Sequence, residues 1–159
     1  MRRVYSSYVK GQIESQPESI IVLLPYYDTT DKAREILESK NIKARELERQ
    51  GSLVIIDIEK VIRTQSFDVP DIERLRAIIN KLDNQYPDKT LFVIADMSVF
   101  HHLKKAKQLI QYEKSLHREI KVEKWKELCL YHERDFDLMF TKKEADELLG
   151  SHKDKVIQF

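Results

Sequence analysis

The segment ELCLYHERDF, residues 127–136, holds residue types that could support metal, redox or acid chemistry. It contains the chain's only cysteine, Cys129, and His132 follows it at a spacing seen among metal ligands. Zinc requires three or four ligands, and the other histidines form no second pair at such a spacing. Cys129 also lies within an apolar run, where thiols are usually inert core residues. The pattern therefore favours a buried strand cysteine over a metal or redox site, and we predict no bound metal.

The segment SIIVLLPYYDTTDKA, residues 19–33, has the strand–turn–helix order of a nucleotide-binding segment. A phosphate loop needs glycines that let backbone amides surround the phosphate and a lysine that supplies charge. This turn has no glycine, its first lysine is Lys32, and the carboxylate of Asp28 would repel phosphate. The sequence therefore argues against a P-loop NTPase, and we predict no enzymatic activity and no cofactor.

Two acids in the second half of the chain have both a structural and a functional interpretation. Asp96 ends the apolar run TLFVIAD, and it could cap the following turn or hold magnesium in a nucleotide-processing enzyme. Capping is the better interpretation because the phosphate loop is missing. Glu113 interrupts the apolar stripe of a predicted helix, so its carboxylate needs a partner. That partner is either a structural donor in the 96–100 turn, which we favour, or a bound ligand.

Short apolar runs alternate with helical patterns along the chain. The runs are continuously apolar, as expected for strands covered on both faces. We predict strands at 19–25, 52–58, 90–96 and 127–132, with a weaker fifth strand, KVIQF, at 155–159. We predict helices at 31–40, 71–84 and 102–120, and a last helix that opens on a capping box at Thr141–Glu144 and stops at Gly150.

This alternation predicts an α/β fold with a mostly parallel sheet flanked by helices. In such sheets ligands bind beyond the carboxyl ends of the strands. At 159 residues we expect one domain, with an N-terminal helical segment at 1–18 and a core at 19–159.

Composition restricts the class of partner. A formal charge of +1 gives no general attraction to nucleic acid or to an anionic membrane. The longest apolar run, Ile20–Leu24, is too short to span a bilayer. A single cysteine cannot form an internal disulfide, which favours a cytoplasmic location.

The order of three motifs resembles the MEDS family, the methanogen and methylotroph sensory domain. The motifs are ADMSVF after a strand, QYEKSL on the next helix, and ELCLYHERDF further on. KARELERQGSLVIID and the closing segment TKKEADELLGSHKDKVIQF also resemble the family. The resemblance covers roughly residues 19–159, and the N-terminal segment departs from the family pattern, which usually includes a further strand there. It implies a core related to the RecA and KaiC ATPases that lacks the phosphate loop.

The resemblance and the strand-end rule together predict a non-enzymatic sensory or signalling module. It would bind a small organic ligand or a signalling protein, and a homodimer is left open. A nucleotide-processing enzyme without a standard phosphate loop and a dimerising scaffold are the alternatives. The predicted ligand contacts are Tyr26, Tyr27, Asp28, Asp96, Met97, Ser98, Glu113 and Tyr131.

Overall fold

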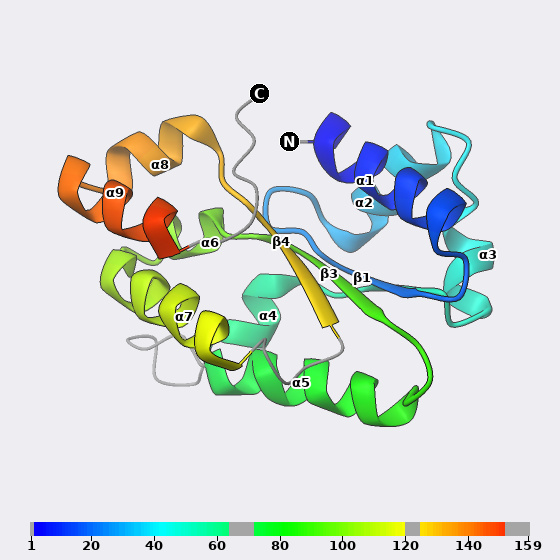
Figure 1. Ribbon diagram of the computed structural model, residues 1–159. Coiled ribbons are helices and arrows are strands. Elements are labelled where there is room, and N and C mark those ends of the chain that lie inside the picture. Colours follow the sequence, from blue (N-terminus) through cyan, green and yellow to red (C-terminus); the bar gives the residue numbers. More distant parts are fainter. Residues whose placement is uncertain (1, 64–71, 120–124, 152–159) are drawn as a thin grey trace.

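The computed structural model describes residues 2–63, 72–119 and 125–151, and within them four strands form one parallel sheet in the order β2-β1-β3-β4 (Figure 1). The predicted α/β fold with a parallel sheet is confirmed. In chain order the elements are α1 (Arg2–Ser15), β1 (Ile20–Leu24), α2 (Thr30–Glu38), α3 (Ala44–Arg49), β2 (Leu53–Ile55), α4 (Ile58–Ile62), α5 (Ile72–Gln85), β3 (Leu91–Asp96), α6 (Ser98–His102), α7 (Ala106–Glu119), β4 (Trp125–Leu130), α8 (Glu133–Met139) and α9 (Lys142–Ser151).

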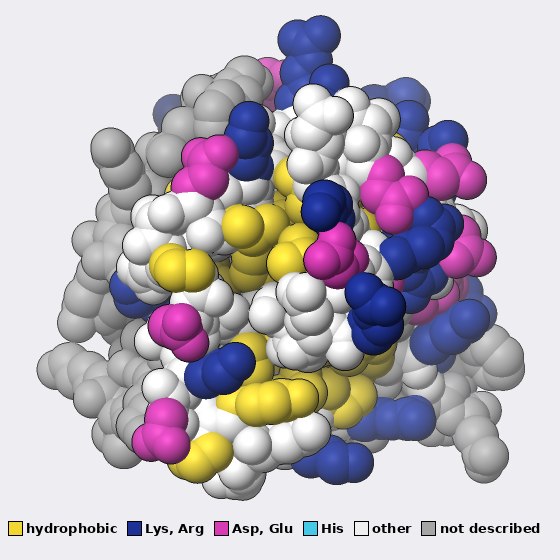
Figure 2. Space-filling model, turned by 90° about the vertical axis from the view of Figure 1, so that its right-hand side faces the viewer, with side chains coloured by type: hydrophobic (Ala, Val, Ile, Leu, Met, Phe, Trp, Pro, Cys, Tyr) yellow, Lys and Arg dark blue, Asp and Glu magenta, His cyan; other side chains and the backbone are white. Residues whose placement is uncertain are grey.

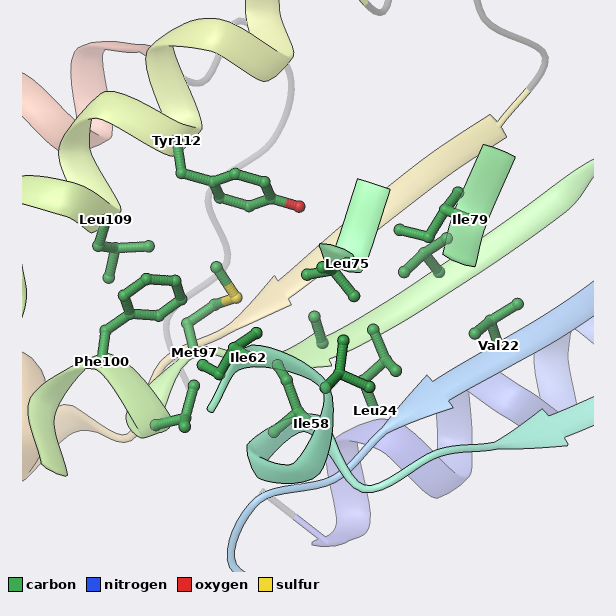
Figure 3. Packing of buried hydrophobic residues seen from close by; sticks show 14 of the residues in the cluster. Val22, Leu24, Ile58, Ile62, Leu75, Ile79, Met97, Phe100, Leu109 and Tyr112 are labelled. Carbon is green, nitrogen blue, oxygen red and sulfur yellow. The ribbon is translucent and has the colours of Figure 1, made fainter. Parts of the chain in front are cut away.

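Both faces of the sheet are buried, which explains why β1 and β3 are continuously apolar. Alternate residues of β1 point to opposite faces: Ile21 and Leu23 to one, Val22 and Leu24 to the other. Helices α1, α2 and α3 cover the first face, whereas α4, α5, α7 and α9 pack on the second (Figure 1). Figure 3 shows this second cluster, in which Leu75 and Ile79 of α5 are fully buried against the sheet.

The predicted strand at 52–58 is too long. β2 ends at Ile55 because Asp57 caps a new helix, α4: its Oδ1 accepts hydrogen bonds from the amides of Glu59 (3.0 Å) and Lys60 (3.3 Å). The strand predicted at 127–132 lies two residues earlier, since β4 begins at Trp125 and ends at Leu130. The predicted strand at 155–159 lies outside the described residues.

The single helix predicted at 102–120 is two helices. Helix α6 ends at His102, Lys104 takes a left-handed conformation with φ of 55°, and α7 starts at Ala106. The amide of Lys105 donates to the carbonyl of Phe100 (2.9 Å), which closes the end of α6. The apolar periodicity gave no signal of this break, because the left-handed position is occupied by a lysine rather than a glycine.

Helices α2 and α9 begin with side-chain caps, and the predicted stop of α9 is wrong. Thr29 caps α2 through a hydrogen bond from the amide of Lys32 (3.2 Å). Thr141 and Glu144 form the predicted capping box at the start of α9, with Thr141 N to Glu144 Oε2 at 2.9 Å. Gly150 does not stop α9, which continues to Ser151.

Figure 2 shows the side of the molecule near α3, where positive and negative side chains are interspersed around apolar patches. Ion pairs join α2 to α3: Arg34 lies 2.7 Å from Glu48, and Arg45 pairs with Glu38. Charges of opposite sign lie close together on these two helices, so they act locally in the fold and create no field of one sign.

Candidate functional site

The carboxyl ends of β1 and β3 lie at the point where the chain changes faces of the sheet. Helices α2 and α3, which follow β1, cover one face, and α6 and α7, which follow β3, pack on the other. Neighbouring strands whose connections leave on opposite faces create a crevice at their carboxyl ends. The crevice here is a pocket of about 690 Å³, within the size range of small-molecule sites.

We call this feature the strand-end pocket. Elements distant in sequence line it: α1, the ends of β1, β3 and β4, α6 and α8. Its lining residues are Arg2, Arg3, Tyr5, Leu23, Leu24, Pro25, Tyr27, Asp28, Asp96, His101, Leu130, His132, Arg134, Asp135 and Leu138.

Asp28, just after β1, anchors α1 to the pocket. Its carboxylate is buried and accepts hydrogen bonds from the Arg2 guanidinium, with Nε–Oδ1 at 2.9 Å and Nη2–Oδ1 at 2.5 Å. The Tyr5 hydroxyl donates to Asp28 Oδ2 at 3.2 Å. Burial and the Asp28 carboxylate raise the pKa of Tyr5 above its usual range, so Tyr5 stays a neutral donor. The first turn of α1 therefore closes one side of the pocket.

Asp135, in the first turn of α8, forms the opposite side. The Tyr27 hydroxyl donates to Asp135 Oδ2, and His101 Nε2 lies 3.9 Å from Oδ1. Burial and this carboxylate raise the pKa of Tyr27, even though 53% of the side chain is exposed. The contact joins the turn after β1 to the helix after β4, across 108 residues.

Asp96 ends β3 between these two sides, and its carboxylate is buried. Its Oδ1 accepts a hydrogen bond from the amide of Ser98 at 3.1 Å, which agrees with the interpretation of Asp96 as a turn cap. Burial raises the pKa of Asp96, and hydrogen bonds from Ser98 and from the amides of Tyr26 and Tyr27 oppose that shift.

A second group of polar side chains lies on the other face of the sheet, and we call it the closed cluster. It consists of Tyr112, Glu113, Glu127, Cys129 and Tyr131. The Tyr131 hydroxyl donates to Glu113 Oε1 at 2.5 Å, and the Tyr112 hydroxyl donates to Glu127 Oε1 at 3.1 Å. The Cys129 thiol interacts with both carboxylates, and burial followed by these charges raises its pKa well above the usual value.

The closed cluster corrects two expectations. Glu113 does meet a hydrogen-bond donor, but the donor is Tyr131, just after β4, whereas we expected the 96–100 turn. Cys129 lies in a strand as predicted and packs against the core, yet it is only partly buried. Because Cys129 packs on the closed-cluster face while His132 lines the pocket, the two do not form a pair.

The eight residues predicted as ligand contacts fall into three places. Tyr27, Asp28 and Asp96 line the strand-end pocket, and the Tyr26 ring lies 5.1 Å from that of Tyr27. Glu113 and Tyr131 belong to the closed cluster. Met97 and Ser98 are buried and do not line the pocket, and Met97 belongs to the core shown in Figure 3.

Sequence reasoning missed pocket residues contributed by α1 and α8. Arg2 and Tyr5 come from a segment with no apparent motif, although its helical character was predicted. Arg134 and Asp135 stand in the segment ELCLYHERDF, in which Cys129 and His132 pointed to metal chemistry instead. The one available signal was their position directly after a strand, which is where this fold places ligand contacts.

The described residues hold no group of three or more His, Cys, Asp or Glu side chains arranged to bind a metal ion. Every helix within residues 2–63, 72–119 and 125–151 is too short or too polar to cross a membrane.

Fold and pocket define an α/β domain with a parallel sheet and a cavity at its topological switch point. The model of the MEDS family, described as the methanogen/methylotroph, DcmR sensory domain, matches residues 1–153, and the chain belongs to this family. The match includes α1, whereas the motifs in the sequence had placed the resemblance at 19–159. No curated protein matches the chain.

Proposed function

We propose that this chain is a non-enzymatic sensory module that binds a small organic ligand in the strand-end pocket. The observation that carries the proposal is the pocket itself, in which helices α1, α6 and α8 meet the carboxyl ends of three strands. Membership of a sensory-domain family supports a signalling role. Of the predicted contacts, Tyr27, Asp28 and Asp96 would meet the ligand, and Tyr26, Met97 and Ser98 would support them from behind.

A ligand in this pocket would contact both α1 and α8. Arg2 and Tyr5 hold α1 to Asp28, and Asp135 holds α8 to Tyr27. Occupancy of the pocket would therefore change the packing of two helices at once, which gives a sensor a route to a signalling protein. We propose that residues 1–159 act as one such unit and that this unit lies in the cytoplasm. We also propose that its core is related to the RecA and KaiC ATPases. The parallel sheet and the acid at the end of β3 support that relation.

A screen of small organic molecules by saturation-transfer NMR tests the proposal. Leu138 lines the pocket and is 65% exposed, so Leu138→Trp should fill the pocket while leaving the core intact. Leu149→Trp is the matched control, because Leu149 is also exposed but does not line the pocket. We expect ligands that bind the wild type and Leu149→Trp but not Leu138→Trp.

Three results would contradict the proposal. Ligands that bind equally well to Leu138→Trp would place the site elsewhere, and a dimer without any ligand would favour a scaffold. Magnesium-dependent ATP hydrolysis that disappears in Asp96→Ala would favour the enzymatic alternative. We expect no such hydrolysis, because the turn after β1 lacks the glycines and lysine of a phosphate loop.

A further inference from the structure

The three carboxylates that line the strand-end pocket are already engaged by the protein. Asp28 accepts from Arg2 and Tyr5, Asp135 accepts from Tyr27, and Asp96 accepts from the amide of Ser98. All three residues are buried, with exposed fractions of 5–8%. A ligand entering the pocket therefore finds acids whose hydrogen-bonding capacity is largely used within the fold.

Two arginines of the pocket, unlike its carboxylates, are not engaged in salt bridges within the described residues. Arg3 in α1 and Arg134 in α8 both line the pocket and are exposed. Among the residues that the structure describes, neither arginine forms a salt bridge. A guanidinium presents a planar set of donors that matches a carboxylate or phosphate. The groups left available to a ligand are thus cationic and lie on the two helices that border the pocket.

Apart from these aspartates and arginines and the rings of Tyr5, Tyr27, His101 and His132, the lining is apolar. Leu23, Leu24 and Leu130 are buried at the base, and Leu138 is exposed at the edge. Such a surface gains from contact with a hydrocarbon body and gives no support to a fully hydrated ion. The ligand that fits both features has an apolar body and one acidic group.

We infer that the strand-end pocket takes a small organic anion, whose carboxylate or phosphate meets Arg3 and Arg134 and whose apolar body contacts Leu138. This inference rests on the proposed function and specifies its ligand class. The pairing of Arg2 with Asp28 leaves Arg2 as part of the wall, so Arg3 and Arg134 set the preference for negative charge.

The test is calorimetric titration of the full chain with three probes of nearly equal shape: cinnamate, cinnamamide and cinnamylamine. Phenyl phosphate and inorganic phosphate distinguish a carboxylate preference from a phosphate preference and from binding of a bare ion. The variants are Arg3→Gln, Arg134→Gln and the double variant. Arg49→Gln is the matched control, since Arg49 is an exposed arginine at the end of α3 and outside the pocket.

We expect an organic anion, cinnamate or phenyl phosphate, to bind about tenfold more tightly than the amide or the amine, as for one charge-assisted hydrogen bond. Each pocket variant should lower that affinity about threefold, half of the tenfold preference in free energy; the double variant should abolish the preference, and Arg49→Gln should bind as the wild type does. Amide or amine binding as tight as that of the acids would overturn the anion inference and leave the proposed function standing. The same holds if the acid preference survives in the double variant. Inorganic phosphate alone binding as tightly as phenyl phosphate would also overturn it, and absence of all binding would defeat both proposals.

Discussion

The strand-end pocket and the closed cluster use the same residue types in opposite ways. Each pairs a tyrosine hydroxyl with a carboxylate: Tyr27 with Asp135 in the pocket, and Tyr131 with Glu113 in the cluster. Tyr27 is half exposed at the opening of a cavity, whereas Glu113 is buried and meets its partner, Tyr131, just after β4. Burial of polar groups with internal partners is a structural arrangement, while polar groups around a cavity remain available to a ligand.

The difference also shows that an acid on an apolar stripe is weak evidence for a site. Glu113 attracted attention because its carboxylate interrupts such a stripe, and the structure pairs that carboxylate within the fold. For Asp96 the sequence favoured a turn cap over a functional role, yet this residue lines the pocket. Position at a strand end was the better guide, because the topology of the sheet determines where cavities form.

The largest effect that we expect on stability is at Glu113. Glu113→Leu removes the carboxylate that accepts from the Tyr131 hydroxyl, which should cost about 1–3 kcal/mol in the free energy of unfolding. Glu113→Gln keeps the shape and an acceptor oxygen, so it should cost less. Thermal and urea denaturation at neutral pH measure both variants. If Glu113→Leu melts at or above the wild type, the cluster does not stabilise the fold.

The two tyrosines give the sharpest matched pair. Tyr131→Phe removes a donor from a buried carboxylate and should cost about 1.5 kcal/mol, the low end for a bond to a charged group. Tyr27→Phe should change stability by less than about 0.5 kcal/mol, because Tyr27 is half exposed. Urea unfolding of both proteins tests the comparison. Equal losses would show that the pocket tyrosine is as structural as its counterpart.

Cys129 should behave as part of the closed cluster in spite of its partial exposure. Burial and two neighbouring carboxylates raise the pKa of its thiol, so the reactive thiolate is scarce at neutral pH. We expect slow reaction with a thiol reagent in the native state and fast reaction after unfolding. Cys129→Ala should lower stability by about 1 kcal/mol. Fast native labelling, or stoichiometric zinc in the purified protein, would contradict this assignment.

The smallest expected effect is the pH dependence due to Asp96. Burial holds its pKa in the folded chain above the usual value of 3.8, so the native state binds this proton more tightly than the unfolded state. The stabilisation that comes from protonation of Asp96 in the native state is therefore present at low pH. It is lost as pH rises from about 3.8 through the folded pKa. Asp96→Asn does not titrate at this position, so it does not lose stability in this way. The free energy of unfolding of the wild type minus that of Asp96→Asn should fall over this range, and a rise would show that the hydrogen bonds to Asp96 outweigh its burial.

The sequence predicted the sheet better than its connections. Strands β1 and β3 were found within a residue because both are buried on both faces and read as unbroken apolar runs. β4 begins with Trp125 and Lys126, and these two residues were missed because the charged Lys126 interrupts the apolar run. Helices α3, α4 and α8 are 5–7 residues long, too short to show a clear apolar period.

The site was predictable on one side only. Tyr27, Asp28 and Asp96 follow from the rule that ligands lie beyond strand ends. Their partners do not, because Arg2 reaches Asp28 across 26 residues and Asp135 meets Tyr27 across 108. Such pairings depend on how α1 and α8 pack in three dimensions, which single-sequence patterns do not contain.

The most direct test of the account is to map binding residue by residue. Amide chemical shifts of the ¹⁵N-labelled chain can be followed during titration with whichever of cinnamate, cinnamamide and cinnamylamine binds most tightly. We predict saturable shifts at Tyr27, Asp28, Asp96 and Arg134, with the amides of Tyr112 and Glu113 unchanged. Shifts concentrated in the closed cluster, with the pocket amides unmoved, would contradict the claim that the strand-end pocket is the ligand site.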